Sequence, residues 1–270
     1  MMSSPIAVPD PTRRLIVALD VSDRASALGV IERLSGLVTM YKIGNQLFTA
    51  EGPALVREVV ESGAGVFLDL KFHDIPNTVA GACASAAALG VSILNVHALG
   101  GVEMMRAAAR GVAESSAAGD CRGGPPCTQL AAPPLSAHDS NRGPTGRPAV
   151  IAVTVLTSMN DASLDEVGVR SNVQEEAVRL ATLARTAGLD GVVASPNEVE
   201  AIRERVAADR FLIVVPGVRP AQIEGDDQKR VATPAEAVRR GADYIVVGRP
   251  IIASPDPRAA AERIIEEIAR

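Results

Sequence analysis

The chain has 270 residues and a formal net charge of −5, and although 47% of its residues are hydrophobic, only 2% are aromatic. Its length suits one large domain, since (β/α)-barrels commonly occupy roughly 250 residues. The acidic balance, the lack of a basic stripe and the scarcity of aromatic side chains for base stacking argue against nucleic acid as a partner.

Targeting signals are not evident. Residues 1–13, an expected N-terminal tail, carry Pro5, Pro9 and Pro11 but no apolar core of a signal peptide. No stretch is apolar over the roughly 18 residues that a membrane span needs. The three cysteines are too few, in a chain this long, to suggest a disulfide framework. We therefore expect a cytoplasmic protein with no membrane partner.

Short apolar runs recur along the chain, and most are followed by a turn and then by a helical pattern. We predict strands at Leu15–Leu19, Met40–Ile43, Gly65–Lys71, Ser92–His97, Ala149–Leu156, Gly191–Ala194, Phe211–Val215 and Tyr244–Val247. Apolar residues at three- and four-residue spacing predict helices at Arg24–Leu37, Pro53–Ser62, Thr78–Leu89, Val102–Ala113, Val173–Ala187, Glu198–Ala207, Pro234–Arg240 and Pro257–Ala269. Such alternation implies parallel strands joined by right-handed crossovers. The sequence predicts an α/β fold, a single-domain (β/α)8 TIM barrel spanning residues 1–270.

One segment, residues 115–148, breaks this alternation because it is rich in Gly, Pro, Ala and Ser. Loops of this kind inside compact domains are usually functional or disordered. The segment follows the fourth predicted helix and precedes the fifth strand, so we expect a flexible insertion on the barrel face opposite the active site. Cys121, Cys127 and His138 lie in it without the tight spacing of a zinc site, and no metal role is predicted for them.

Polar side chains gather where a barrel carries its function, at the carboxyl ends of the strands. They are Asp20, Lys42, Asp69, Lys71, His97, Thr157, Arg219 and Arg249. This one-sided placement favours an active site over a set of structural charges. His97 is interpreted as a hydrogen-bonded barrel residue and His73 as a cap of its strand. Neither has a partner at metal-ligand spacing, so no catalytic metal is predicted.

The chain is organised around Gly65–Thr78, an apolar strand that turns abruptly ionic. Successive side chains of a strand alternate between its faces, so Asp69 and Lys71 should project from the same face. Asp74 follows, just before Pro76 begins a helix. Burying these charges costs free energy unless they pair with each other or with a ligand. A structural ion pair remains the alternative for Asp69 and Lys71 taken alone.

Two turns near the C-terminus predict a phosphate site. Val215–Arg219 follows the seventh predicted strand and Val247–Pro250 follows the eighth, where barrels often hold phosphate on backbone N–H groups. Arginine adds a planar fork that matches phosphate oxygens. The polar loop 225–230, which contains Gln228, is either a lid over such a ligand or an ordinary solvated loop.

Taken together, these strand-end motifs resemble the orotidine 5'-phosphate decarboxylase family of bacterial type. The motifs are Leu19-Asp20, Tyr41-Lys42-Ile43-Gly44, Asp69-x-Lys71-x-x-Asp74-Ile75-Pro76-Asn77-Thr78, Val153-Thr154-Val155-Leu156-Thr157-Ser158, Pro216-Gly217-Val218-Arg219, Gly225-Asp226-Asp227-Gln228 and Val247-Gly248-Arg249-Pro250. The resemblance covers nearly the whole chain except the tail and residues 115–148. The Asp-x-Lys-x-x-Asp element alone is shared with a wider superfamily of decarboxylases and aldolases.

The resemblance implies a carboxy-lyase that converts orotidine 5'-phosphate to UMP and CO₂, the last step of de novo pyrimidine biosynthesis, with no metal or organic cofactor. Loss of CO₂ leaves a carbanion at C6 that the ring carbonyls cannot delocalise, so a fixed cation and a proton are needed beside it. By resemblance Lys71 supplies both. Asp69, Lys42 and Asp74 complete the catalytic set, and Asp69 would crowd the substrate carboxylate while it holds the lysine.

The resemblance also implies the contacts to ribose and base. Lys42 would bridge Asp69 and the ribose, and Asp20 would accept a hydrogen bond from a ribose hydroxyl. Thr157 would contact the pyrimidine edge, and Gln228 would span the base and the phosphate.

The remaining implied contacts concern the phosphate and a second subunit. Arg219, Gly248 and Arg249 would hold the phosphate. Asp74 and Thr78 would reach in trans into the neighbouring subunit's site, so the resemblance implies a homodimer with shared active sites.

Two other functions compete with this interpretation. A metal-dependent relative acting on keto-gulonate phosphate shares the Asp-x-Lys-x-x-Asp element, but it carries a magnesium-holding acid where this chain has Lys42, and a cation there would repel the metal. A phosphosugar-binding barrel that has lost activity would lack Lys71, Asp69 or Lys42, and all three are present. The complete set favours the orotidylate decarboxylase.

Overall fold

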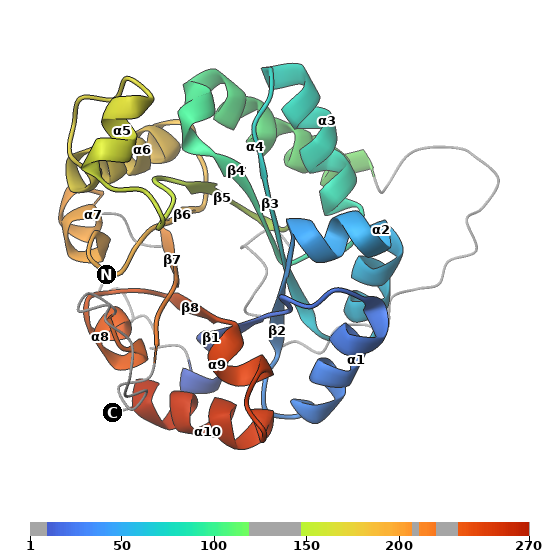
Figure 1. Cartoon of the computed structure of the whole chain (residues 1–270). Helices are drawn as coiled ribbons and strands as arrows, with labels where there is room; N and C mark the ends of the chain where they lie inside the picture. Colours follow the sequence, from blue (N-terminus) through green and yellow to red (C-terminus); the bar gives the residue numbers. More distant parts are fainter. Residues whose placement is uncertain (1–9, 119–146, 207–210, 220–231, 270) are drawn as a thin grey trace, which may run out of the picture.

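The computed structural model describes residues 10–118, 147–206, 211–219 and 232–269, and in it parallel strands close into a barrel in chain order. The strands are β1 (Leu15–Ala18), β2 (Met40–Gly44), β3 (Gly65–Phe72), β4 (Ile93–His97), β5 (Ala149–Val153), β6 (Gly191–Val193), β7 (Leu212–Pro216) and β8 (Tyr244–Val247). β8 closes the ring by pairing with β1, where Leu15 lies opposite Ile245. Figure 1 shows the strands at the centre and the helices around them. The predicted (β/α)8 fold is confirmed.

Helices fill the connections between the strands. They are α1 (Arg24–Arg33), α2 (Asn45–Glu61), α3 (Pro76–Ala87), α4 (Gly101–Ala118), α5 (Asp161–Glu166), α6 (Val173–Thr186), α7 (Val199–Arg205), α8 (Pro234–Arg239), α9 (Arg249–Ile252) and α10 (Pro257–Ile268), with the short 3-10 turns η1 (Pro11–Arg13) and η2 (Ala98–Gly100). Local sequence fixes several of their starts. Asp23, Asn172 and Asp256 each accept a hydrogen bond from a backbone N–H of the first helical turn, and Thr233 forms a capping box with Glu236.

Two apolar clusters cover the two faces of the barrel wall. The inner one is formed by Ile16, Ala18, Met40, Phe67, Ile93, Ala149, Ile151, Val153, Val193, Val214 and Val246. The larger, outer one lies between the alternate strand residues and the helices. Because both faces are covered, the strands are near-continuous apolar runs, and every side chain of Leu15–Ala18 is buried.

The element bounds differ from prediction at identifiable signals. α2 begins at Asn45 rather than Pro53, because Gly52 (φ 66°) and Pro53 interrupt the helix and make its second half look like a start. β5 ends at Val153 rather than Leu156. The short helices α5 and α9 were not predicted.

The predicted tail and insertion are only partly described. α4 continues to Ala118, and Arg147 pairs with Asp190, so structured residues occupy both ends of the segment 115–148. Within the predicted tail, Pro11–Arg13 form η1. Residues 1–9 and 119–146 lie outside the described residues, so flexibility and placement there stay predictions.

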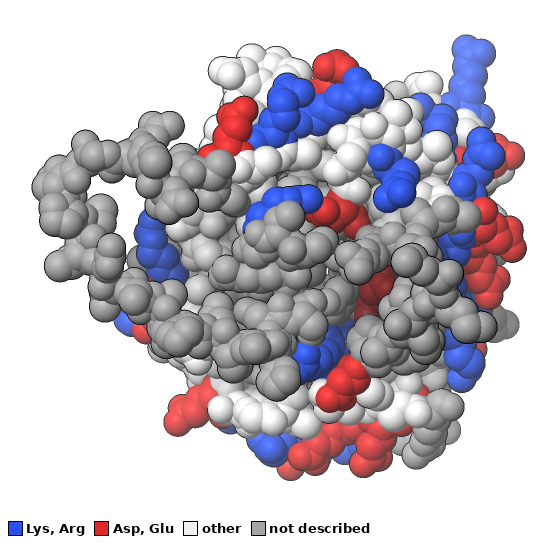
Figure 2. Space-filling model, turned by 180° about the vertical axis from the view of Figure 1, so that it is seen from behind, with Lys and Arg blue, Asp and Glu red and all other residues white. Residues whose placement is uncertain are grey.

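The surface carries charges of both signs. In the view of Figure 2, acidic and basic side chains are interspersed around the rim. Among the described residues, no helix is long and apolar enough to cross a membrane.

Candidate active site

The carboxyl end of β3 departs from regular strand geometry. Leu68 pairs with Leu94 and Phe72 with Val96, so residues 69–71 of β3 stand opposite Asn95 alone. Lys71 adopts φ 52°, the single positive φ of a non-glycine residue in the described chain. A bulge of this kind re-aims a side chain at the rim of a barrel. The Lys71 ammonium is thereby turned back toward the carboxylate of its own strand.

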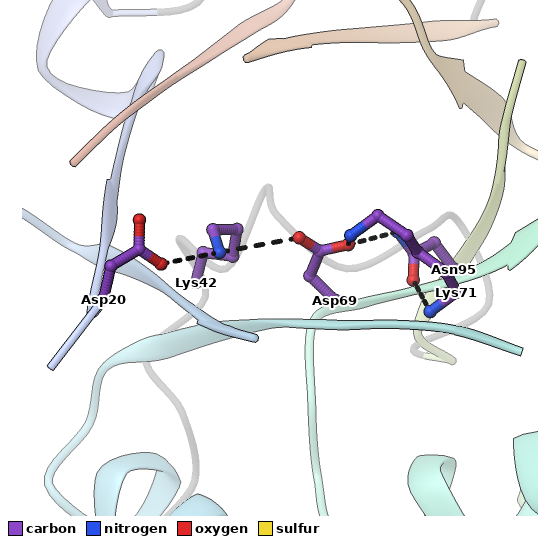
Figure 3. A network of polar contacts seen from close by, with 5 residues as sticks. All are labelled: Asp20, Lys42, Asp69, Lys71 and Asn95. Atoms are coloured by element: carbon purple, nitrogen blue, oxygen red, sulfur yellow. Dashed lines mark hydrogen bonds and ion pairs between the residues drawn. The ribbon is translucent and has the colours of Figure 1, made fainter. Parts of the chain in front are cut away.

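A row of alternating charges crosses the barrel mouth from β1 to β3 (Figure 3). Lys71 Nζ lies 2.7 Å from Asp69 Oδ1, and Lys42 Nζ lies 3.5 Å from Asp69 Oδ2. Lys42 Nζ also donates a hydrogen bond to Asp20 Oδ1 at 3.1 Å. Four of the residues predicted to form the site are therefore in one connected network: Asp20 lies just beyond β1, Lys42 lies within β2, and Asp69 and Lys71 lie in the second half of β3.

Burial increases toward the middle of this row. The side chains of Asp69 and Lys42 are each 13% exposed, whereas Lys71 is 31% and Asp20 is 51% exposed. Burial alone would raise the pKa of Asp69, but Lys42 and Lys71, together with hydrogen bonds from Lys71 and Asn95, outweigh it and hold that pKa below its ordinary value. Asp69 is thus an anion at neutral pH, fixed between two cations.

Asn95, on β4, belongs to this network although the sequence did not indicate it. Its side chain is fully buried, Nδ2 donates to Asp69 Oδ1 at 2.7 Å, and Oδ1 accepts from the Lys71 backbone N–H at 2.8 Å. One signal could have revealed it. Asn95 is a polar residue inside β4, flanked by Leu94 and Val96 and two positions after the inward-facing Ile93, and a buried amide requires partners.

The loop after β8 packs directly on the end of β1. A side-chain carbon at Gly248 would lie 3.0 Å from Asp20 Oδ2 and 3.4 Å from the Cβ of Ala18, so the position is best filled without a side chain. Arg249 follows as the first residue of α9 and is exposed. After β7, Arg219 is partly buried, and its backbone N–H donates to the Ala232 carbonyl. The predicted phosphate loop of β8 thus lies beside the Asp20 end of the charged row.

Comparison with known proteins agrees with this geometry. Residues 13–264 match the model of the Orotidine 5'-phosphate decarboxylase / HUMPS family. The chain belongs to this family. It is 52% identical to an orotidine 5'-phosphate decarboxylase of Moorella thermoacetica (94% of this chain, 92% of the relative) and 51% identical to one of Geobacter sulfurreducens (94% and 95%). A crystal structure of orotidine 5'-phosphate decarboxylase from Lactobacillus acidophilus aligns with a TM-score of 0.75 at 34% identity, covering 96% of this chain and all of that one.

Other predicted residues of this orotidine 5'-phosphate decarboxylase family member lie apart from the charged row. Asp74 is exposed, and its Oδ1 accepts from the Ile75 N–H at 2.6 Å. Thr78, in the first turn of α3, is exposed, and so is Thr157 beyond β5. Within the described part of the chain Asp74 forms no ion pair with Lys71. Gln228 and its loop lie outside the described residues, so their role as a lid stays a prediction.

The two histidines of the mouth stack on each other. The ring centroids of His73 and His97 are 5.5 Å apart with the planes 18° from parallel. His97 Nδ1 accepts from the Leu99 N–H at 3.4 Å, in line with the predicted hydrogen-bonded role. Burial, followed by the neighbouring His73 and Lys71, lowers the pKa of His97. His97 is therefore neutral near pH 7.

The site's carboxylates are held by lysines rather than arranged as a metal cage. Across the described residues, no group of three or more His, Cys, Asp or Glu side chains could hold a metal ion. Lys42 Nζ lies between the carboxylates of Asp20 and Asp69.

Proposed function

We propose that this chain catalyses the decarboxylation of orotidine 5'-phosphate to UMP and CO₂, the final step of de novo pyrimidine biosynthesis, without a metal or organic cofactor. The observation that carries the proposal is the Lys42–Asp69–Lys71 cluster at the barrel mouth. Family membership and relatives about half identical over nearly the whole chain support it.

Lys71 is proposed as the acid. When the C6–carboxylate bond breaks, its electron pair stays at C6 and CO₂ leaves. The C6 carbanion then takes a proton from the Lys71 ammonium, whose positive charge stabilises the developing anion before the transfer. Asp69, 2.7 Å from the ammonium, holds it in place, so that the cation does not have to move or reorient as negative charge develops at C6.

Asp69 would act on the substrate as well as on Lys71. Its carboxylate is nearly buried and ionised, so a substrate carboxylate bound beside Lys71 would face a fixed negative charge. Loss of CO₂ relieves that repulsion, whereas the attraction between Lys71 and the developing carbanion grows. The difference between the two states favours the transition state.

The rest of the charged row fits a ribose phosphate. Lys42 and Asp20 present a donor and an acceptor for ribose hydroxyls. Gly248 lies beside Asp20, so the phosphate held by Gly248, Arg249 and Arg219 would sit a short way beyond the sugar. Thr157 and Gln228 are proposed to contact the base, and Gln228 also the phosphate. The binding energy of these distant contacts would help to stabilise the transition state at C6.

A homodimer is proposed to complete the site. Asp74 and Thr78 are exposed, and Ile75 between them is 67% exposed although apolar. Covering Ile75 with a second subunit would remove apolar surface from water and bring Asp74 and Thr78 to the partner's mouth. The proposed location is the cytoplasm, as expected from the sequence.

One experiment tests the reaction and its main competitor. Purified protein is given orotidine 5'-phosphate in buffer containing EDTA, and consumption is followed by ultraviolet absorbance. We expect turnover in EDTA, and none with Lys71→Ala. A folded parent protein that fails to consume orotidylate would overturn the proposal, and activity on keto-gulonate phosphate restored by magnesium would identify the metal-dependent relative instead.

A further inference from the structure

We propose that Asn95 is a positioning residue of the decarboxylation: its amide holds the Lys71 backbone and the Asp69 carboxylate in one fixed arrangement, so that the ammonium is aimed at C6. The inference rests on the proposed function. Asn95 is fully buried and does not itself reach the substrate. Its effect would pass through the two charged residues that it contacts.

The first contact supports an unusual backbone conformation. Lys71 adopts φ 52°, a left-handed conformation that side chains with a Cβ rarely occupy and that persists only where the surroundings impose it. The bulge leaves residues 69–71 opposite Asn95 alone, so regular strand pairing is interrupted there. Asn95 Oδ1 accepts the Lys71 N–H at 2.8 Å in place of a strand carbonyl.

The second contact fixes the position of the Asp69 carboxylate. Asn95 Nδ2 donates to Asp69 Oδ1 at 2.7 Å, and this oxygen also accepts from Lys71 Nζ. A carboxylate only accepts, and a backbone N–H only donates, so each end of the amide has a single suitable partner. Turning the amide over would place oxygen against oxygen and NH₂ against N–H. Asn95 therefore holds the Lys71 backbone directly and the Lys71 ammonium through Asp69 Oδ1.

This arrangement makes a distinctive kinetic prediction. The substrate's phosphate and ribose contacts do not involve Asn95, so substrate binding should survive its replacement. The position of the ammonium relative to C6 should change, however, and a reacting group misplaced by about 1 Å can cost roughly a hundredfold in rate. A residue that merely stabilises the barrel would instead lower the folded fraction and leave kcat per folded molecule unchanged.

Two variants separate the contacts. Asn95→Ala removes both hydrogen bonds. Asn95→Asp keeps the shape and the acceptor for the Lys71 N–H, but in its ionised form it sets a second carboxylate against Asp69. When protonated at lower pH, that carboxyl donates to Asp69 again. Leu94→Ala is the matched control, because Leu94 is a fully buried neighbour on β4 whose side chain belongs to the outer cluster.

The measurement is kcat and KM for orotidylate between pH 5 and 8, with folded fraction from denaturant unfolding. Asn95→Ala should lose roughly a hundredfold in kcat while KM changes by less than about threefold. Asn95→Asp should recover relative to the parent protein as pH falls, and Leu94→Ala should lose stability but not kcat. Parent-like kcat in folded Asn95→Ala, or an equal kcat loss in Leu94→Ala, would overturn the proposal. An inactive parent protein would instead refute the proposed function.

Discussion

The two ends of the barrel carry different kinds of ion pair. Two arginine–aspartate pairs lie at the amino ends of β5 to β8, which we call the barrel floor, and their donors bind other protein groups. The lysine–aspartate pairs lie at the carboxyl ends of the strands, at the barrel mouth. Arg147 binds Asp190 through two nitrogens at 2.8 Å each, and Asp190 also accepts the Val150 N–H. Lys71 meets Asp69 through its ammonium, and the ammonium of Lys42 contacts both Asp69 and Asp20. An ammonium has three donors, so each lysine keeps at least one beyond these contacts. Similar charges thus bind protein groups at one end of the barrel and, in the proposed function, a ligand at the other.

The second arginine–aspartate pair divides its donors between a carboxylate and backbone carbonyls. Arg203 donates to the Gly241 and Phe211 carbonyls and to Asp243, and Asp243 accepts the Ile213 N–H. Arg147 binds a carboxylate in bidentate fashion and Arg203 spreads its donors over three acceptors, so each guanidinium has little capacity left for another partner. An ammonium is a point charge with three donors, so it can hold Asp69 and still meet a substrate.

The largest expected effect is at the mouth. Lys71→Ala should lower kcat by about 10⁴-fold or to the detection limit, since it removes both the proton and the cation. Lys71→Arg is the matched variant, because it keeps a charge beside Asp69 but a guanidinium does not release its proton near neutral pH. Kinetics with orotidylate check both variants. Full activity in a folded Lys71→Ala protein would remove Lys71 from the mechanism.

Arg249→Ala should have the next largest effect. Loss of one charge-assisted contact to phosphate costs about 1.5–3 kcal/mol, which corresponds to a fall of about ten- to a hundredfold in kcat/KM for orotidylate. Arg258→Ala is the control, since Arg258 is also exposed but lies on α10 and donates to the Ser35 carbonyl. Equal kcat/KM values for the two variants would show that Arg249 does not bind the phosphate.

At the floor, Arg147→Ala should change stability and not catalysis. Asp190 would keep the Val150 N–H but lose both guanidinium bonds while only 23% exposed, and the free energy of unfolding should fall by about 1.5–3 kcal/mol. Urea unfolding measures this loss, and kcat for orotidylate should equal that of the parent protein. A lowered kcat in the folded variant would mean that the two ends of the barrel are coupled.

The sequence predicted the charges at the barrel mouth but not the ion pairs at the floor, and the difference lies in how each set of contacts follows from the chain. The barrel and the row Asp20–Lys42–Asp69 follow from strand periodicity, because charges at the ends of successive parallel strands meet at one mouth. The floor pairs were missed: Arg147 and Asp190 are 43 positions apart and meet only because β5 and β6 are neighbours.

The bulge and Asn95 were missed for a related reason. Regular alternation already placed Asp69 and Lys71 on one face, so nothing local required an irregular strand. The bulge exists in the register between β3 and β4, which single-strand patterns do not contain. Asn95 finds its partners on β3, and the sequence of β4 alone does not identify them.

The smallest expected effect is a pH dependence confined to the mouth. His97 is stacked on His73, its Nδ1 accepts the Leu99 N–H, and burial, then His73 and Lys71, lowers its pKa below the ordinary 6.5. Protonation would make Nδ1 a donor and break the bond to Leu99. Below pH 6.5 the unfolded chain therefore binds a proton that the folded protein resists, and stability falls as pH drops toward the lowered pKa.

His97→Gln should remove the contribution of His97 to the slope of stability against pH. Arg147→Ala should lower stability at every pH and leave that slope unchanged. Urea midpoints measured between pH 5 and 7.5 make the comparison, with the parent protein showing the full slope. Because other groups also titrate on unfolding, the informative quantity is the difference between the slopes of the two variants. Parallel curves for His97→Gln and the parent protein would mean that His97 titrates alike in the folded and unfolded states, and the stacked pair would then contribute no pH dependence to the mouth.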